Sequence, residues 1–159
     1  MTLHLVRHAD AGNRGAWTGD DFGRPLDDHG QMQAEAIAVA LAERPVRRIL
    51  SSPYVRCVDT VVPLGRALGL PVEASDELAE GSYVADALDL LGSLAAAEGD
   101  SALCSHGDVI PGVLWVLSRH GLDIGDLGRC KKGSIWELEV VDGMIAAATY
   151  RHPRTFGAA

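Results

Sequence analysis

The sequence has few cysteines and no long apolar segment, and each shortage excludes a class of protein. Its three cysteines, Cys57, Cys104 and Cys130, are odd in number and widely spaced, which argues against a disulfide framework and a structural zinc site. The apolar stretches are far shorter than the roughly 20 residues that span a bilayer. The first ten residues, MTLHLVRHAD, are charged and lack the pattern of a signal peptide. We therefore expect a soluble, cytoplasmic protein.

Positive charge is also scarce. The chain has 14 lysines and arginines against 22 aspartates and glutamates, a formal net charge of −8. Such a chain is a poor general binder of nucleic acid or of an anionic membrane, because its field repels phosphate. A phosphate site would have to be built locally from a few converging cations. The length of 159 residues and the 47% hydrophobic content are typical of one folded domain, so we expect a single domain over residues 1–159.

Short apolar runs alternate with segments of helical spacing along the chain. This alternation predicts a three-layer α/β/α fold with a mostly parallel central sheet. In such folds the active crevice lies beyond the carboxyl ends of the strands. The predicted strands are residues 3–6, 48–51, 71–74 and 102–105, the predicted helices are residues 31–44, 55–68, 84–97 and 109–119, and a hairpin pairs residues 134–141 with 144–150.

Arginine and histidine follow three of these strands. Arg7 and His8 end the first strand, His106 follows residues 102–105, and Arg56 lies in the first turn of the helix after residues 48–51. A cation at a helix N-terminus opposes the helix dipole, which suggests that Arg56 faces an anion. Each feature alone fits a surface pair or a structural histidine. Together they predict one crevice whose guanidinium and imidazole donors match a phosphoryl group.

Three short motifs carry a family resemblance. Residues 5–9 (LVRHA), 51–60 (SSPYVRCVDT) and 105–107 (SHG) resemble, in order and spacing, the histidine phosphatase superfamily, also called the phosphoglycerate mutase-like family. Arg24-Pro25-Leu26 looks like the short SixA-like branch. Residues 13–28 and 132–136 are similar to the phosphatase domain found with some MutT-type Nudix proteins. The resemblance covers residues 3–150 and implies a phosphoglycerate mutase-like fold.

The resemblance also implies catalytic roles. His8 would be the nucleophile that forms a phosphohistidine, Arg7 and Arg56 would hold the phosphoryl oxygens, and His106 would stabilise the charge of the transferring group. No metal or other cofactor is expected, because side chains supply the positive charge. The nucleophile must be neutral, and we expect the neighbouring arginine charges to lower the pKa of His8.

The general acid is less well defined by the resemblance. The segment from Asp76 to Gly81 resembles the family segment that carries the proton donor, and the alignment selects Glu80 over Asp76 and Glu77. A solvated acidic loop is the other interpretation. The SixA type tends to lack this acid. An alkoxide leaving group gains roughly 10²–10⁴ in rate from an acid, whereas an imidazole with a pKa of about 6.5 needs less help. A glutamate in the site would therefore favour an ester or nucleotide substrate.

Other residues are candidates for substrate binding, although for the cations an ordinary solvated position is the competing interpretation. Trp17 and Phe22 could stack on a base or cover the site, but we expect them to form a small packed cluster. The predicted substrate-binding residues are Asn13, Arg24, Ser52, Lys131 and Lys132.

The sequence thus predicts a phosphatase that hydrolyses a small phosphomonoester or nucleotide through a phosphohistidine on His8. Two alternatives stay open. One is a SixA-like phosphatase acting on a phosphohistidine protein, and the other is a non-catalytic module that binds a phosphorylated ligand. Nucleic acid and membrane are not expected as partners.

Overall fold

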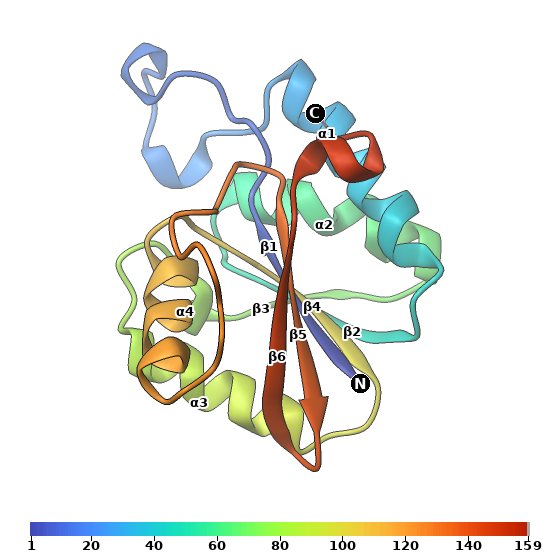
Figure 1. The fold of residues 1–159 in the computed structure, drawn as a ribbon. Helices are drawn as coiled ribbons and strands as arrows, with labels where there is room; N and C mark the ends of the chain where they lie inside the picture. Colours follow the sequence, from blue (N-terminus) through green and yellow to red (C-terminus); the bar gives the residue numbers. More distant parts are fainter. Residues whose placement is uncertain (159) are drawn as a thin grey trace.

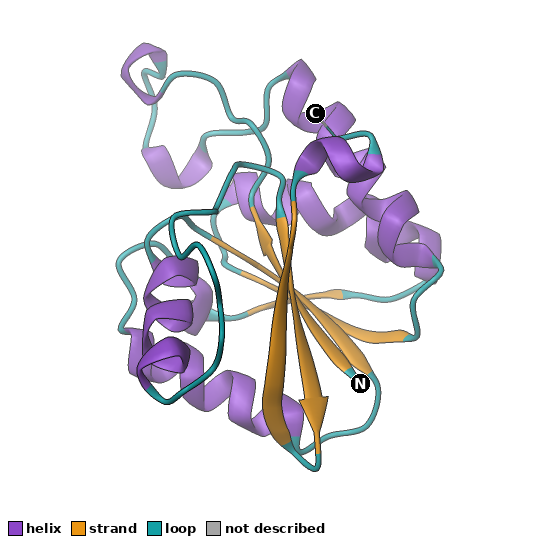
Figure 2. Ribbon diagram, viewed as in Figure 1, coloured by secondary structure: helices purple, strands orange, loops and turns teal. Residues whose placement is uncertain are grey.

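The computed structural model describes residues 1–158 and contains one six-stranded sheet between two layers of helices (Figures 1 and 2). The strand order is β3-β2-β4-β1-β5-β6. The pairs β3–β2, β2–β4 and β4–β1 are parallel, whereas β5 is antiparallel to both of its neighbours. The predicted three-layer fold with a mostly parallel sheet is confirmed. The strands are β1 (Thr2–Arg7), β2 (Val46–Ser51), β3 (Val72–Ala74), β4 (Asp100–Ser105), β5 (Ile135–Val141) and β6 (Met144–Arg151).

Four α-helices cover the two faces of the sheet. Helices α1 (Asp28–Ala42) and α2 (Val55–Leu68) lie on one face, and α3 (Val84–Ala95) and α4 (Val109–Arg119) lie on the other (Figure 1). The bounds of α2 and α4 agree with the sequence prediction. Helix α1 begins three residues earlier than predicted, because the Asp27 side chain accepts a hydrogen bond from the Gly30 amide and caps the helix there. Helix α3 ends two residues earlier than predicted.

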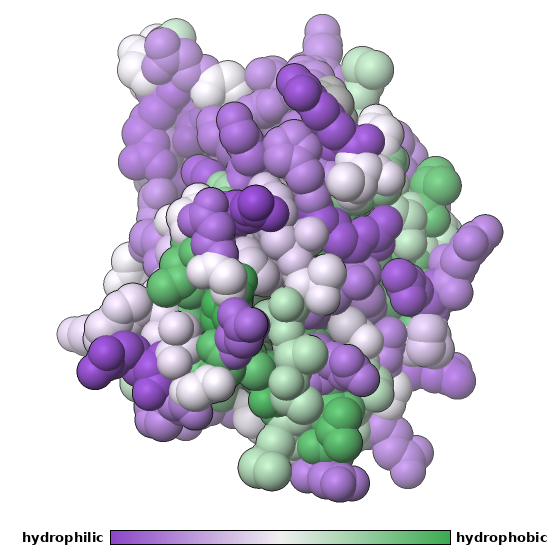
Figure 3. All heavy atoms as spheres, viewed as in Figure 1, coloured by the Kyte–Doolittle hydropathy of each residue, from purple (hydrophilic) through white to green (hydrophobic). Residues whose placement is uncertain are grey.

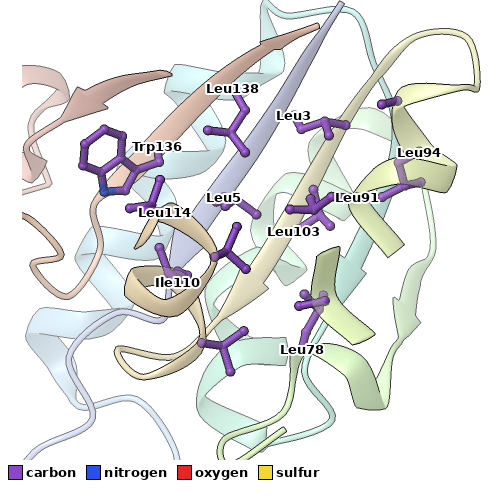
Figure 4. Packing of buried hydrophobic residues seen from close by; sticks show 14 of the residues in the cluster. Leu3, Leu5, Leu78, Leu91, Leu94, Leu103, Ile110, Leu114, Trp136 and Leu138 are labelled. Carbon is purple, nitrogen blue, oxygen red and sulfur yellow. The ribbon is translucent and has the colours of Figure 1, made fainter. Parts of the chain in front are cut away.

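The core is divided by the sheet into two apolar clusters. Leu3 and Leu5 of β1 pack with α3 and α4, as Figure 4 shows for one side. Val6, on the opposite face of the same strand, packs with Ile37 of α1 and Val61 of α2. Successive strand residues point to opposite faces, and both faces are covered, which explains why the central strands are apolar throughout.

The start of α1 lies directly against the chain that leaves β1. A Cβ atom built on Gly30 would lie 1.8 Å from the carbonyl oxygen of Asp10, and the Asp27 amide donates to that same oxygen at 3.1 Å. Only glycine fits this approach. The contact holds the segment after His8 against the helix, so the fold itself positions that end of β1.

Figure 3 shows a mostly hydrophilic surface around the loop that follows β1 and around the C-terminal turn, whereas apolar atoms gather beside α4 and over β6. The exposed apolar side chains include Trp115 of α4 and Met144 of β6. Within residues 1–158, no helix is both long enough and apolar enough to cross a membrane.

We predict that Gly30→Ala lowers the free energy of unfolding by about 2 kcal/mol, because the methyl group meets a backbone oxygen that cannot rotate away. Gly92→Ala is the matched control. Gly92 lies in α3 with no atom within 4 Å of an added Cβ, so the substitution should raise the free energy of unfolding by about 0.5 kcal/mol. Urea unfolding of both variants measures the difference, and equal effects would contradict the proposed contact.

Candidate active site

The register of the sheet brings two histidines together at its carboxyl edge. Strand β1 pairs with β4 so that Arg7 lies opposite Ser105. The amide of His8 donates to the Ser105 carbonyl at 3.0 Å, which places His8 beside His106. The two imidazole rings are 5.3 Å apart between centroids, in an edge-to-face arrangement.

The His8 side chain is a buried imidazole with a defined tautomer. Its Nδ1 lies 2.8 Å from the carbonyl oxygen of Ala9. Because a carbonyl oxygen only accepts, Nδ1 carries the proton and the lone pair of a neutral ring is on Nε2. Burial is the main cause that lowers the pKa of His8 to about 3, and the neighbouring His106, Arg56 and Arg7 lower it further. The arginine charges thus act in the predicted direction, but burial is the larger cause.

Arg7 is held in place by the backbone. Its Nη1 donates to the Cys130 carbonyl, and its guanidinium packs over Gly107, where an added Cβ would lie 2.7 Å from Cζ. Glycine at this position therefore lets the guanidinium approach the start of α4. The Nε of Arg7 is buried and has no hydrogen-bond partner among residues 1–158.

Arg56 is fully buried in the first turn of α2. Its Nη1 lies 3.2 Å from a carboxylate oxygen of Asp21, and its Nη2 lies 3.2 Å from Oε2 of Glu80. These carboxylates offset the unfavourable placement of a cation at a helix N-terminus. Like that of Arg7, the Nε of Arg56 is buried without a partner in the described part of the chain.

A hydroxyl group and a thiol group contact the Nε2 atom of His106. Its Nε2 lies 2.8 Å from Oγ of Ser52 and 3.4 Å from Sγ of Cys57. When Ser52 donates to Nε2, the proton of the neutral ring is on Nδ1. That nitrogen is buried and, within residues 1–158, has no partner. It is then a third donor that an anion could satisfy.

Glu80 lies in the same cavity as the nucleophile candidate. The cavity has a volume of about 340 Å³, and its lining includes His8, Arg7, Arg14 and Glu80. The second carboxylate oxygen of Glu80 accepts from Nη2 of Arg14 at 2.8 Å. Asp76 and Glu77, the two alternative acids, instead line a separate cavity of about 650 Å³ next to α3.

Only some of the predicted substrate-binding residues line the cavity that contains His8. Arg24 and Lys132 line the 340 Å³ cavity, and Arg24 is buried with its Nε 2.9 Å from Asp21. Lys131 faces a larger adjoining cavity. Ser52 contacts His106, and Asn13 caps a short 3-10 helix by accepting from the Gly15 amide. A direct contact of Ser52 or Asn13 with phosphate stays a prediction.

The packed cluster expected for Trp17 and Phe22 is not found. The two side chains are 40% and 45% exposed, because the loop after β1 projects from the body of the protein (Figure 1). Phe22 does contact the ring of Tyr54, with centroids 5.0 Å apart. The same loop carries Asp21, which the sequence did not identify. The only signal for Asp21 was the density of aspartate and glycine in that segment.

A buried neutral imidazole, one buried and one partly buried guanidinium group and a carboxyl group lie together at the carboxyl edge of an α/β sheet, and they form a site suited to phosphoryl transfer. Comparison with known proteins also indicates a phosphoryl-transfer enzyme. The profile of the Histidine phosphatase superfamily (branch 1) matches residues 3–86, and the chain belongs to that superfamily.

One curated relative supports the same assignment, and two solved structures share the fold. The chain is 35% identical over 156 residues to the 8-oxo-(d)GTP phosphatase of Mycolicibacterium smegmatis, an alignment that covers 96% of this chain and 48% of the relative. The chain therefore spans about half the length of that protein. In structure it is similar to the protein histidine phosphatase SixA complexed with tungstate, with a TM-score of 0.77, 21% identity and coverage of 98% and 99% of the two chains. A mycobacterial glucosyl-3-phosphoglycerate phosphatase matches with a TM-score of 0.73, 20% identity and coverage of 95% and 97%.

The lowered pKa of His8 predicts a pH dependence of stability. The folded protein keeps this ring neutral down to about pH 3, whereas the unfolded chain protonates it at about pH 6.5. Between these values the unfolded state binds more protons, so stability falls as the pH drops below 6.5. The loss between pH 7 and pH 4.5 should be about 2 kcal/mol smaller in His8→Asn than in the wild type. Urea unfolding at each pH tests this, with the exposed His120→Asn as control. Identical slopes in wild type and His8→Asn would contradict a buried neutral ring.

Proposed function

We propose that this histidine phosphatase hydrolyses a small phosphomonoester or a nucleotide through a covalent phosphohistidine on His8. One observation carries the proposal. The protonated Nδ1 of His8 is fixed on the Ala9 carbonyl, and the ring shares a cavity with Arg7 and Glu80. This arrangement leaves a neutral nitrogen nucleophile beside cationic donors and an acid.

In the first step the lone pair on Nε2 of His8 attacks phosphorus. A P–N bond forms, and the P–O bond to the leaving group breaks with its electron pair moving to that oxygen. Glu80 donates a proton to the oxygen, so an alcohol leaves rather than an alkoxide.

In the second step a water oxygen attacks phosphorus and the P–N bond breaks. The Glu80 carboxylate takes a proton from the water. Inorganic phosphate is released, and His8 returns to its neutral form. The acid is thereby restored to its protonated form, and the cycle is balanced without a further reactant.

Electrostatic stabilisation would come from Arg7, Arg56 and His106. Each has a buried nitrogen without a partner among the described residues, and an unsatisfied buried donor costs roughly 1–3 kcal/mol. Phosphoryl oxygens would satisfy these donors and spread their charge over them, which is the main catalytic contribution expected in phosphoryl transfer.

The substrate class follows from the acid and from one relative. Glu80 in the cavity favours leaving groups that need a proton, as in esters, over the imidazole of a phosphohistidine protein. The name of the mycobacterial relative, 8-oxo-(d)GTP phosphatase, supports a purine nucleotide as a substrate to test, although that protein is about twice as long.

We predict that His8→Ala abolishes turnover of p-nitrophenyl phosphate, sugar phosphates, nucleotides and a phosphohistidine peptide, because the covalent step is lost. Rapid quenching of the wild type with a ³²P-labelled ester should leave label on the protein, and His8→Ala should leave none. Label retained in the variant would rule out His8 as the attacked group. Phosphate binding without any turnover by the wild type would instead indicate a binding module.

We predict that Glu80→Gln lowers kcat/KM for a sugar phosphate by about 10²–10⁴-fold, and for p-nitrophenyl phosphate far less, because nitrophenolate leaves without a proton. Glu77→Gln, three residues away and lining another cavity, is the control and should change neither. Equal losses on both substrates in Glu80→Gln would reject the proton-donor role. A preference of the wild type for the phosphohistidine peptide would favour a protein substrate.

A further inference from the structure

A second cavity, larger than the catalytic one, adjoins it. Its volume is about 960 Å³, and it shares Arg7 and Lys132 with the 340 Å³ cavity. The other walls come from residues 128–131, which precede β5, from residues 150 and 152–155 at the C-terminal end of β6, and from Asp10, His29 and Gln33 (Figure 1). The two cavities are therefore neighbours across two cationic side chains.

The charge of this cavity is opposite to that of the whole chain. Its lining contains one carboxylate, Asp10, which lies 2.7 Å from His29 and 3.8 Å from Nζ of Lys132. Against a net charge of −8, such a concentration of cations creates a local positive field that attracts anions. Five cationic side chains line the cavity: Arg7, Arg129, Lys131, Lys132 and Arg154.

Hydrogen bonds hold the backbone that carries Arg129, Lys131 and Lys132 in place relative to the nucleophile. The Gly133 amide donates to the carbonyl oxygens of both Arg7 and His8, at 3.1 Å each. The Lys131 amide donates to the Tyr150 hydroxyl at 3.2 Å, and the Arg129 carbonyl accepts from the indole of Trp136 at 2.8 Å. The segment before β5 is thus tied to β1 and β6, so the cavity is preformed.

We propose that this cavity binds a second anionic group of the substrate, so that favoured substrates carry a phosphate on their leaving group. This inference rests on the proposed phosphatase function. Consecutive phosphates share one bridging oxygen. When the terminal phosphoryl group lies at His8, the next phosphate falls beside Arg7 and Lys132, the two residues common to both cavities. Arg129 and Arg154, on the other walls of the same cavity, would contact the outer oxygens of that second phosphate.

Two substrate types have this chemistry, a nucleoside diphosphate and a sugar bisphosphate. In the diphosphate the broken bond joins the terminal phosphorus to the bridging oxygen, and the nucleoside monophosphate leaves with that oxygen. A phosphate of second pKa about 6 leaves without a proton near neutral pH. In the bisphosphate an alkoxide leaves and takes the proton of Glu80. Dependence on Glu80 therefore distinguishes the two.

The test compares two double variants of equal charge change, Arg129→Gln/Arg154→Gln in the cavity and Arg47→Gln/Arg66→Gln elsewhere on the surface. We expect the first to lower kcat/KM for GDP, relative to that for p-nitrophenyl phosphate, by about tenfold or more, because charge-assisted contacts are lost. The kcat/KM for fructose 1,6-bisphosphate, relative to that for fructose 6-phosphate, should fall by a similar factor in this variant. The surface variant should leave both ratios unchanged. Ratios unchanged in the cavity variant would overturn the proposal.

A binding measurement separates this inference from the catalytic one. In His8→Ala, calorimetry should show inorganic pyrophosphate binding at least tenfold more tightly than inorganic phosphate, and the two arginine substitutions added to His8→Ala should remove that advantage. Equal affinities would overturn the second subsite even if the enzyme is active. Tighter pyrophosphate binding would support it even if no phosphatase activity is found. If Arg129→Gln/Arg154→Gln lost turnover only of a phosphohistidine peptide, the result would overturn the second subsite in favour of a protein partner.

Discussion

The hydrogen bond between Nδ1 of His8 and the Ala9 carbonyl sets the chemistry of the site. It selects one tautomer, and burial keeps the ring neutral. Neither effect would be useful without the β1–β4 register, which places the amide of His8 on the Ser105 carbonyl. Backbone pairing, tautomer and nucleophilicity are therefore linked through two consecutive residues, and the surrounding cations act on a group that is already oriented.

Charge is distributed locally rather than globally. An acidic chain gathers guanidinium groups at one edge of its sheet and partly neutralises them with its own carboxylates, Asp21 and Glu80 on Arg56. A phosphoryl group entering the cavity competes for the same guanidinium. New charge-assisted hydrogen bonds to the phosphoryl group offset the free energy lost when these ion pairs break. The buried guanidinium group is therefore paired with an anion both before and after the substrate binds.

The sequence predicted the parts of the fold that follow regular periods. Helices α2 and α4 have the predicted bounds because Pro53 precedes α2 and Gly69 caps its end, and because Pro111 is tolerated in the first turn of α4. The meeting of His8 and His106 follows from the rule for carboxyl ends of parallel strands. Contacts made by the loop after β1 could not be predicted, since Asp21 and Arg56 meet through irregular backbone. Arg129 and Arg154 come together only because β5 and β6 add to the edge beside β1.

The first residue and the C-terminal turn lie at opposite ends of the parallel strands (Figure 1). Met1 precedes β1 and lies at the amino edge of the parallel strands, whereas residues 152–155 form a wall of the 960 Å³ cavity (Figure 1). For immobilisation or labelling, a tether at the first residue leaves both openings clear. A label attached within residues 152–155 lies on the wall of that cavity and obstructs large solutes first.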